Sequence, residues 1–118
     1  VFIDFFPLNE KVAQAETKIN ELNDKMARKE YESARIYDTM EYYSAALKYY
    51  DSVSEIYHDT QYAPLALYNK IKLLVDRKRE SEALAETQKF LGKYPDHPNF
   101  ADVEKIKQSL ESKLSSNP

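Results

Sequence analysis

Apolar residues recur every three or four positions through most of this chain, which is the spacing of one face of an α-helix. The first such run consists of Val12, Ala15, Ile19, Leu22 and Met26. It lies in a stretch from Asn9 to Thr39 without Pro or Gly, and Asn9 itself is a helix-start signal, so we expect a first helix over 9–39. The run also fits a coiled-coil seam, but it ends at Lys29, short of the three heptads that such a seam requires.

Four further helices follow from the same periodicity. They are predicted over residues 42–57, 64–77, 80–91 and 100–114. Pro64 suits the first turn of the third predicted helix, where its missing N–H costs nothing, and Gly92 suits the residue just after the fourth. No stretch alternates in the manner of a strand, so the pattern predicts an all-α fold.

The chain also repeats itself with a period of 37 residues. Ala46 and Ala83, Tyr57 and Tyr94, and His58 and Pro95 are each separated by that distance. Each unit reads as helix, short turn, helix and then an aromatic residue before Pro or His, which is the plan of a tetratricopeptide repeat. We therefore expect antiparallel helix–turn–helix repeats, with about five helices in a right-handed solenoid segment. The alternative is an irregular helical bundle in which the spacing is coincidental.

This plan divides the chain as one tetratricopeptide domain over 1–118. Its predicted parts are a remnant of a preceding repeat (1–8), a repeat with a long first helix (9–60), a second repeat (61–98), a capping helix (99–114) and a frayed tail (115–118). The predicted packing positions of the repeats are Ala34, Tyr37, Tyr43, Ala46, Tyr50, Val53, Ala83 and Pro95.

Composition excludes several classes of function. The net charge is −3 and the only basic run is Arg77–Arg79, so we expect no nucleic-acid partner. The chain has no Cys, and its two His residues lie in separate turns, so we expect neither metal nor other cofactor. A single Gly excludes a glycine-rich phosphate loop, and the carboxylates alternate with Lys and Arg as on a solvated surface. No catalytic constellation emerges, and we expect a protein that is not an enzyme.

The predicted function is therefore protein binding, and the first helix of each repeat offers the candidates, because such helices line the concave face of a solenoid. Arg28, Tyr31 and Arg35 form a stripe of residue types that are common in interfaces. The full set of candidate partner-binding residues is Arg28, Tyr31, Arg35, Asp38, Tyr68 and Lys72. The convex face remains an equal alternative.

Residues 22–68 resemble a known family more specifically. The phrase Leu22, Asp24, Lys25, Ala27 and Arg28 is followed by Glu30-Tyr31, Ala34 and Tyr37, then by Ala45-Ala46 and by Tyr57, His58, Asp59 and Thr60. This order and spacing resemble the BamD family of outer-membrane assembly lipoproteins. Two departures are His58 in place of the usual Pro, and Glu41-Tyr42 where a Gly often marks the turn.

The resemblance implies a non-catalytic scaffold of the complex that inserts β-barrel proteins into the outer membrane. It implies a location in the periplasm, tethered to the outer membrane by an upstream lipid anchor, with no direct membrane insertion by this segment. The implied partners are the POTRA domains of the barrel subunit, docked by the C-terminal repeats, and the other lipoproteins of the complex. The apolar start, residues 1–6, also suggests self-association through that end.

Two other scaffolds remain open. One is a periplasmic tetratricopeptide coordinator of the Tol–Pal type. The other is a repeat adaptor that clamps the C-termini of peptides, for which Asn69 with Lys72 is a poor start to a carboxylate clamp.

Overall fold

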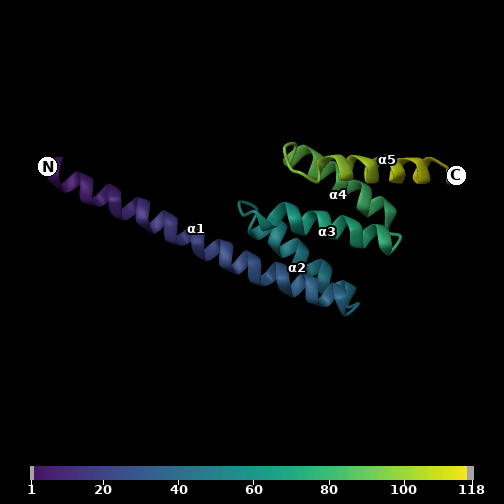
Figure 1. The fold of residues 1–118 in the computed structure, drawn as a ribbon, viewed down its shortest axis with the longest axis horizontal. Coiled ribbons are helices and arrows are strands. Elements are labelled where there is room, and N and C mark those ends of the chain that lie inside the picture. Colours follow the sequence, from purple (N-terminus) through teal and green to yellow (C-terminus); the bar gives the residue numbers. More distant parts are fainter. Residues whose placement is uncertain (1, 117–118) are drawn as a thin grey trace.

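The computed structural model describes the backbone of residues 2–116 and the side chains of residues 11–116. In that part, five α-helices follow one another (Figure 1). They are α1 (Phe2–Thr39), α2 (Tyr43–Ile56), α3 (Tyr62–Asp76), α4 (Glu80–Lys93) and α5 (Phe100–Ser116). Each helix packs against the next, and α1 also reaches α3. The predicted all-α class is confirmed, and the arrangement is that of a helical-repeat solenoid.

The first helix is longer than the sequence pattern indicated. The predicted start at Asn9 is wrong, because α1 begins at Phe2 and includes Pro7. A proline inside a helix removes one backbone hydrogen bond and costs roughly 3 kcal/mol, but the breaker-free stretch that follows lets the helix continue. The N-terminal part of α1 therefore extends beyond the other helices (Figure 1), and the molecule measures 72 × 30 × 20 Å. The assignment of residues 1–8 to a preceding repeat stays a prediction.

The ends of the other helices lie within two residues of the predicted ones. Pro64 lies in the first turn of α3, as expected. The last helix continues to Ser116, so the predicted end at Leu114 is two residues early. The remainder of the predicted frayed tail, residues 117–118, lies outside the described residues.

The turns inside the two hairpins are built alike. Glu41 follows α1 with φ of 66°, and Lys78, 37 residues later, follows α3 with φ of 61°. In each turn the residue after Glu41 or Lys78 donates its backbone N–H to the carbonyl five residues earlier. Tyr42 donates to Tyr37 and Arg79 donates to Leu74, both at 2.9 Å. This is a Schellman motif with a non-glycine residue in the left-handed position. Glu41 thus adopts the conformation for which the resembled family often has Gly.

Gly92 is not the helix-ending residue that the sequence suggested. It lies inside α4, which continues to Lys93, and its φ is not positive. A Cβ added at Gly92 would meet no atom within 4 Å. The residue that follows α4 is Tyr94, with φ of −127°, so this helix end has no left-handed position for a glycine to fill.

Replacing Gly92 with Ala is therefore expected to stabilise the fold by roughly 0.5–1 kcal/mol, because Ala restricts the unfolded chain and favours helix. Urea unfolding followed by circular dichroism measures this change. A destabilised Gly92→Ala protein would contradict the assignment of Gly92 to a helix interior with free space around it.

The core lies where successive helices cross. Ala34 of α1, Ala46, Tyr50 and Val53 of α2, and Ala66 and Leu73 of α3 form one buried cluster, with Tyr37 and Tyr43 partly buried against it. A second cluster joins α3, α4 and α5 through Leu67, Ile71, Phe90 and Val103. Ala83 belongs to a third, smaller cluster with Leu74 and Leu110. Of the predicted packing positions, Pro95 lies exposed in the turn before α5.

The outer face of α5 is polar. Val103 and Leu110 are buried against the rest of the molecule, whereas Glu104, Gln108 and Glu111 are exposed. Thirty-seven residues earlier in the sequence, the corresponding positions are Leu67, Ile71 and Leu74, which are all buried. The equivalent face of α3 thus belongs to the core, and that of α5 faces solvent.

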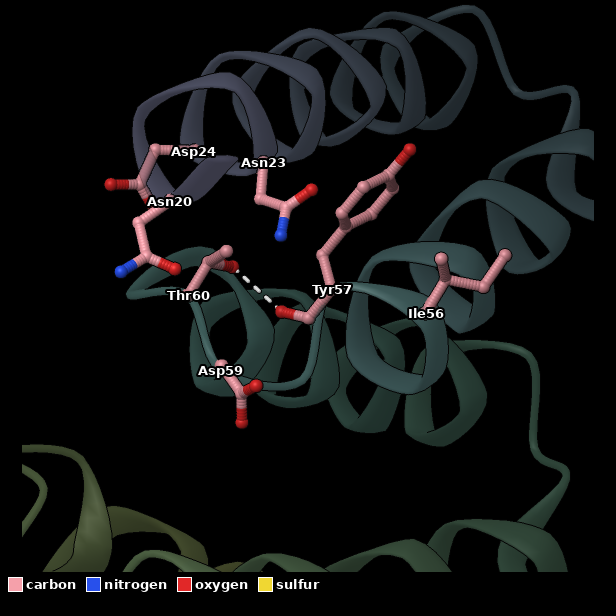
Figure 2. Close-up of a pocket in the computed structure, with 7 residues that line it drawn as sticks. All are labelled: Asn20, Asn23, Asp24, Ile56, Tyr57, Asp59 and Thr60. Carbon is pink, nitrogen blue, oxygen red and sulfur yellow. Dashed lines mark hydrogen bonds between the residues drawn. The ribbon is translucent and has the colours of Figure 1, made fainter. Parts of the chain in front are cut away.

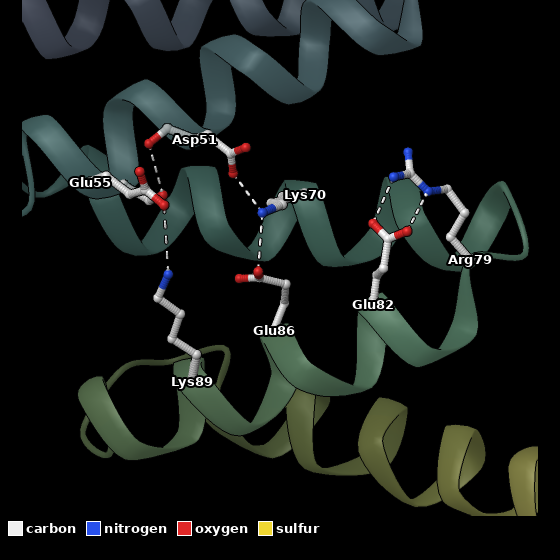
Figure 3. Close-up of polar contacts among 8 residues, drawn as sticks. Asp51, Glu55, Lys70, Arg79, Glu82, Glu86 and Lys89 are labelled. Carbon is white, nitrogen blue, oxygen red and sulfur yellow. Dashed lines mark hydrogen bonds and ion pairs between the residues drawn. The ribbon is translucent and has the colours of Figure 1, made fainter.

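A network of ion pairs joins the helices on the side of α2 and α4 (Figure 3). The ammonium of Lys70 on α3 lies 2.5 Å from Asp51 Oδ1 on α2 and 3.1 Å from Glu86 Oε1 on α4. Burial lowers the pKa of Lys70, but its hydrogen bonds to the two carboxylates outweigh that effect and raise the pKa above its ordinary value. Lys70 therefore stays charged while connecting three helices.

Within the described residues, no helix combines the length and the apolar character that are needed to cross a membrane.

Candidate functional site

The candidate site is a groove between the first helices of the two hairpins. Its walls come from the C-terminal part of α1 and the C-terminal half of α3. The residues that line this α1–α3 groove are Arg35, Asp38, Thr39, Asn69, Lys72, Leu73 and Asp76. The structure thus brings Arg35, Asp38 and Lys72 of the predicted set into one groove.

Two tyrosines fix the relative positions of the helices that form this face. Asn69 Nδ2 on α3 donates to the hydroxyl of Tyr31 on α1 at 2.8 Å. The hydroxyl of Tyr68 on α3 donates in turn to Asp102 Oδ2 on α5. That hydrogen bond, aided by burial, raises the pKa of Tyr68 to about 12. Each tyrosine therefore links its own helix to the first helix of the next unit.

Each of these tyrosines has a cation one helical turn further on. Arg35 Nη1 lies 3.5 Å from the hydroxyl of Tyr31, and Lys72 Nζ lies 5.4 Å from the ring centre of Tyr68. Tyr31 and Tyr68 are 37 residues apart, and so are Arg35 and Lys72. We call this arrangement the tyrosine–cation pair, and the structure displays it once on α1 and once on α3.

Neither cation of these pairs is neutralised by an ion pair within the described residues 11–116. Arg28, Lys70, Arg79 and Lys89, in contrast, all lie within 4.0 Å of a carboxylate oxygen. Arg35 and Lys72 therefore line the groove without an ion pair within 4.0 Å in the described part of the chain, although Asp38 and Asp76 line the same groove.

One of the two aspartates that line the groove already takes part in a hydrogen bond. Asp38 Oδ2 accepts a hydrogen bond of 2.9 Å from the hydroxyl of Tyr50, whose side chain is fully buried. Burial and this bond raise the pKa of Tyr50 well above its ordinary range, so Tyr50 remains neutral and acts as a donor. Asp38 consequently stabilises the crossing of α1 and α2 while its carboxylate faces the groove.

The remaining candidates lie elsewhere. Arg28 is exposed on α1, seven residues before Arg35, and pairs with Glu32 at 3.0 Å, which raises the pKa of Arg28. Tyr31 and Tyr68 support the face without lining the α1–α3 groove itself. Sequence reasoning missed Asn69 as a link between α1 and α3, since no local pattern shows that its amide meets Tyr31. It also missed Asp76, which the 37-residue offset from Thr39 would have placed on the same face.

A second hollow lies between α1 and the turn that follows α2 (Figure 2). Asn20, Asn23 and Asp24 of α1 face Ile56, Tyr57, Asp59 and Thr60 across it. In that turn the hydroxyl of Thr60 donates to the carbonyl of Tyr57 at 2.8 Å. This hollow contains none of the candidate partner-binding residues, but Asp24, Tyr57, Asp59 and Thr60 belong to the motifs that carry the family resemblance.

Within the described residues, no group of three or more His, Asp or Glu side chains is arranged to hold a metal ion. The α1–α3 groove itself presents two cations (Arg35 and Lys72), two carboxylates (Asp38 and Asp76), the amide of Asn69 and the hydroxyl of Thr39.

Comparison with known proteins places this geometry in context. A family model described as an outer membrane lipoprotein, YfiO, matches residues 1–75. That range covers α1, α2 and nearly all of α3, so it includes every residue that lines the α1–α3 groove except Asp76. No curated protein matched the chain.

Proposed function

Because this chain belongs to the YfiO family of outer membrane lipoproteins, we propose that it is a non-catalytic scaffold of the outer-membrane β-barrel assembly complex. Family membership supports association with the outer membrane. The proposal adds a periplasmic location, a lipid anchor upstream of this segment, and docking of the POTRA domains of the barrel subunit. The other lipoproteins of that complex are further partners under this proposal.

The observation that carries the proposal is the tyrosine–cation pair displayed on the first helices of two successive hairpins, α1 and α3. Arg35 and Lys72 project the same charge at equivalent places of two repeats, and both line the α1–α3 groove. A repeated charge on a rigid scaffold suits a protein partner that presents carboxylates or backbone carbonyls at a matching interval. The tyrosines contribute rigid contact area with little loss of conformational entropy.

The experiment is a calorimetric titration of the chain with purified POTRA domains. Saturable binding is expected, and Arg35→Ala or Lys72→Ala is each expected to weaken it by about tenfold, because each removes one charge-assisted hydrogen bond. The double variant is expected to lose more than either single one, since the two residues contact different parts of the partner.

Two variants serve as matched controls. Arg28→Ala removes an arginine from the same helix, but one that is already paired with Glu32 at an exposed position, and Lys89→Ala removes the cation paired with Glu55 on α4. Both are expected to change the affinity by less than about threefold. Equal losses in all four variants would show non-specific charge attraction, and a folded chain that binds no POTRA domain would refute the proposal.

A further inference from the structure

The hydroxyl of Tyr31 keeps a proton that the fold does not use. Asn69 Nδ2 lies 2.8 Å from this hydroxyl and 2.9 Å from the carbonyl oxygen of Leu65. Because a carbonyl only accepts hydrogen bonds, the nitrogen of the Asn69 amide faces both groups, and Tyr31 accepts the bond from Asn69. Arg35 Nη1 lies 3.5 Å from the same oxygen, and a guanidinium only donates. The Tyr31 oxygen thus accepts from two N–H groups, and its own proton has no acceptor within the described residues 11–116.

The ring of Tyr31 is held in place by two aromatic neighbours. Its centroid lies 5.9 Å from the ring of Tyr62 and 6.4 Å from the ring of Tyr50, which is fully buried. Both rings are tilted against that of Tyr31, by 38° and 54°. The Tyr31 hydroxyl therefore has a fixed place beside the guanidinium of Arg35, and little conformational entropy is lost when a ligand binds to it.

The two tyrosine–cation pairs differ in this free proton. The hydroxyl of Tyr68 donates to Asp102, so its proton is already used. Lys72 is therefore the only donor that the pair on α3 offers, whereas the pair on α1 offers two donors side by side, the hydroxyl of Tyr31 and the guanidinium of Arg35.

Two adjacent donors, one of them cationic, suit an anionic acceptor with two oxygens. One oxygen of a carboxylate accepts from the guanidinium and the other from the phenol, whereas a backbone carbonyl offers one oxygen and no charge. Asp38 lines the same groove, but its Oδ2 accepts from Tyr50 and it forms no ion pair with Arg35. We propose that Tyr31 and Arg35 form a carboxylate-binding site, which takes an Asp or Glu side chain of the protein partner. The partner, though not the site, rests on the proposed function.

A titration with sodium acetate tests the site without any protein partner. The signal of the Arg35 side-chain Nε–H is followed by NMR, with sodium chloride at equal concentrations as the reference. Acetate is expected to shift this signal saturably, with a dissociation constant on the order of 50 mM. Tyr31→Phe is expected to weaken acetate binding about fivefold, because it removes one of the two donors.

The matched control for this substitution is Tyr49→Phe. It removes the same atom from a tyrosine of α2 that stacks on Tyr37 and does not line the α1–α3 groove. Acetate binding is expected to change by less than about twofold. An equal response of Arg35 to chloride and acetate would overturn the proposal, and so would acetate binding that Tyr31→Phe leaves unchanged.

A fluorotyrosine at position 31 separates donation to the ligand from support of the fold. Fluorine on the ring makes the hydroxyl a stronger donor and a weaker acceptor. If Tyr31 donates to the carboxylate, acetate binding is expected to strengthen about twofold at a pH where the phenol stays neutral. If the hydroxyl only accepts from Asn69 and Arg35, binding will be weaker or unchanged, and either result would refute the role of Tyr31 as a donor.

Calorimetry with the POTRA domains distinguishes failure of this inference from failure of the proposed function. Their Asp and Glu residues are changed in turn to Asn and Gln, and one such change is expected to lose its effect in the Tyr31→Phe background. An intact acetate site in a chain that binds no POTRA domain would keep the site and refute the function. POTRA binding that Arg35→Ala weakens and Tyr31→Phe does not would keep the function and refute the two-donor site for the partner.

Discussion

Replacing Phe90 with Ala is expected to destabilise the fold by about 4 kcal/mol. Phe90 is fully buried on α4, where it contacts Leu67 and Ile71 of α3 and Val103 of α5. Its ring also lies 5.5 Å from the His97 ring in an edge-to-face arrangement. Truncation removes the buried ring and leaves a cavity that three helices line, and helices held by other contacts collapse into such a cavity only in part. Urea denaturation followed by circular dichroism measures the loss.

The location of the damage is a second test of the same substitution. Because each helix of a solenoid contacts mainly its neighbours, the loss is expected to loosen α4 and α5 before α1 and α2. Hydrogen exchange of backbone amides resolves this order. Ile56→Ala, on a side chain that is 67% exposed, is the control and is expected to cost less than about 0.5 kcal/mol. A Phe90→Ala cost close to that of the control would contradict the packing described for α4.

Replacing Lys70 with Met is expected to cost about 3 kcal/mol. The change keeps most of the aliphatic stem and removes the ammonium, so Asp51 and Glu86 are left without their shared cation (Figure 3). The Glu86 side chain is only 18% exposed and cannot recover full hydration, whereas Asp51, at 41%, recovers part of it. The expected cost therefore lies at the lower end of the range for breaking a buried ion pair.

The same network supplies the controls for Lys70. Lys89→Met removes a cation that lies 4.0 Å from Glu55 with both side chains partly exposed, and is expected to cost less than about 1 kcal/mol. Adding Glu86→Gln to Lys70→Met is expected to recover part of the loss, because one unpaired charge disappears. Since the pKa of Lys70 is raised in the folded state, its contribution is present at neutral pH and is lost only as the pH rises above about 10.5. A Lys70→Met variant as stable as Lys89→Met would show that the buried carboxylates find other partners.

The apolar periodicity of the sequence was sufficient to predict the helices and their order. The 37-residue spacing of small residues such as Ala46 and Ala83, both fully buried, also indicated where helices cross. The wrong helix ends were predicted at residues that usually break a helix but are tolerated within these helices. Pro7 does not end α1, because the helix-favouring residues after it outweigh one lost hydrogen bond. Gly92 does not end α4, and non-glycine residues adopt the left-handed turns at Glu41 and Lys78, held by backbone hydrogen bonds that a sequence pattern does not reveal.

Less of the candidate site than of the fold could be predicted from the sequence. The 37-residue offset relates Tyr31 to Tyr68 and Arg35 to Lys72, so both tyrosine–cation pairs could be found from spacing alone. Lys70 reads in the sequence as one more surface lysine, and only the packing of α2 and α4 around α3 shows that it is mostly buried. That Arg28 is paired, whereas Arg35 and Lys72 form no ion pair within the described residues 11–116, likewise depends on side-chain positions in three dimensions.

The polar outer face of α5 limits where a further repeat could be added to this molecule. Glu104, Gln108 and Glu111 stand where α3 presents Leu67, Ile71 and Leu74, so a further hairpin added after α5 would find no apolar surface to cover. A duplicated unit placed between α4 and α5 would instead meet apolar faces on both sides. Gene duplication within this architecture is therefore expected to insert repeats between α4 and α5 rather than against the polar face of α5.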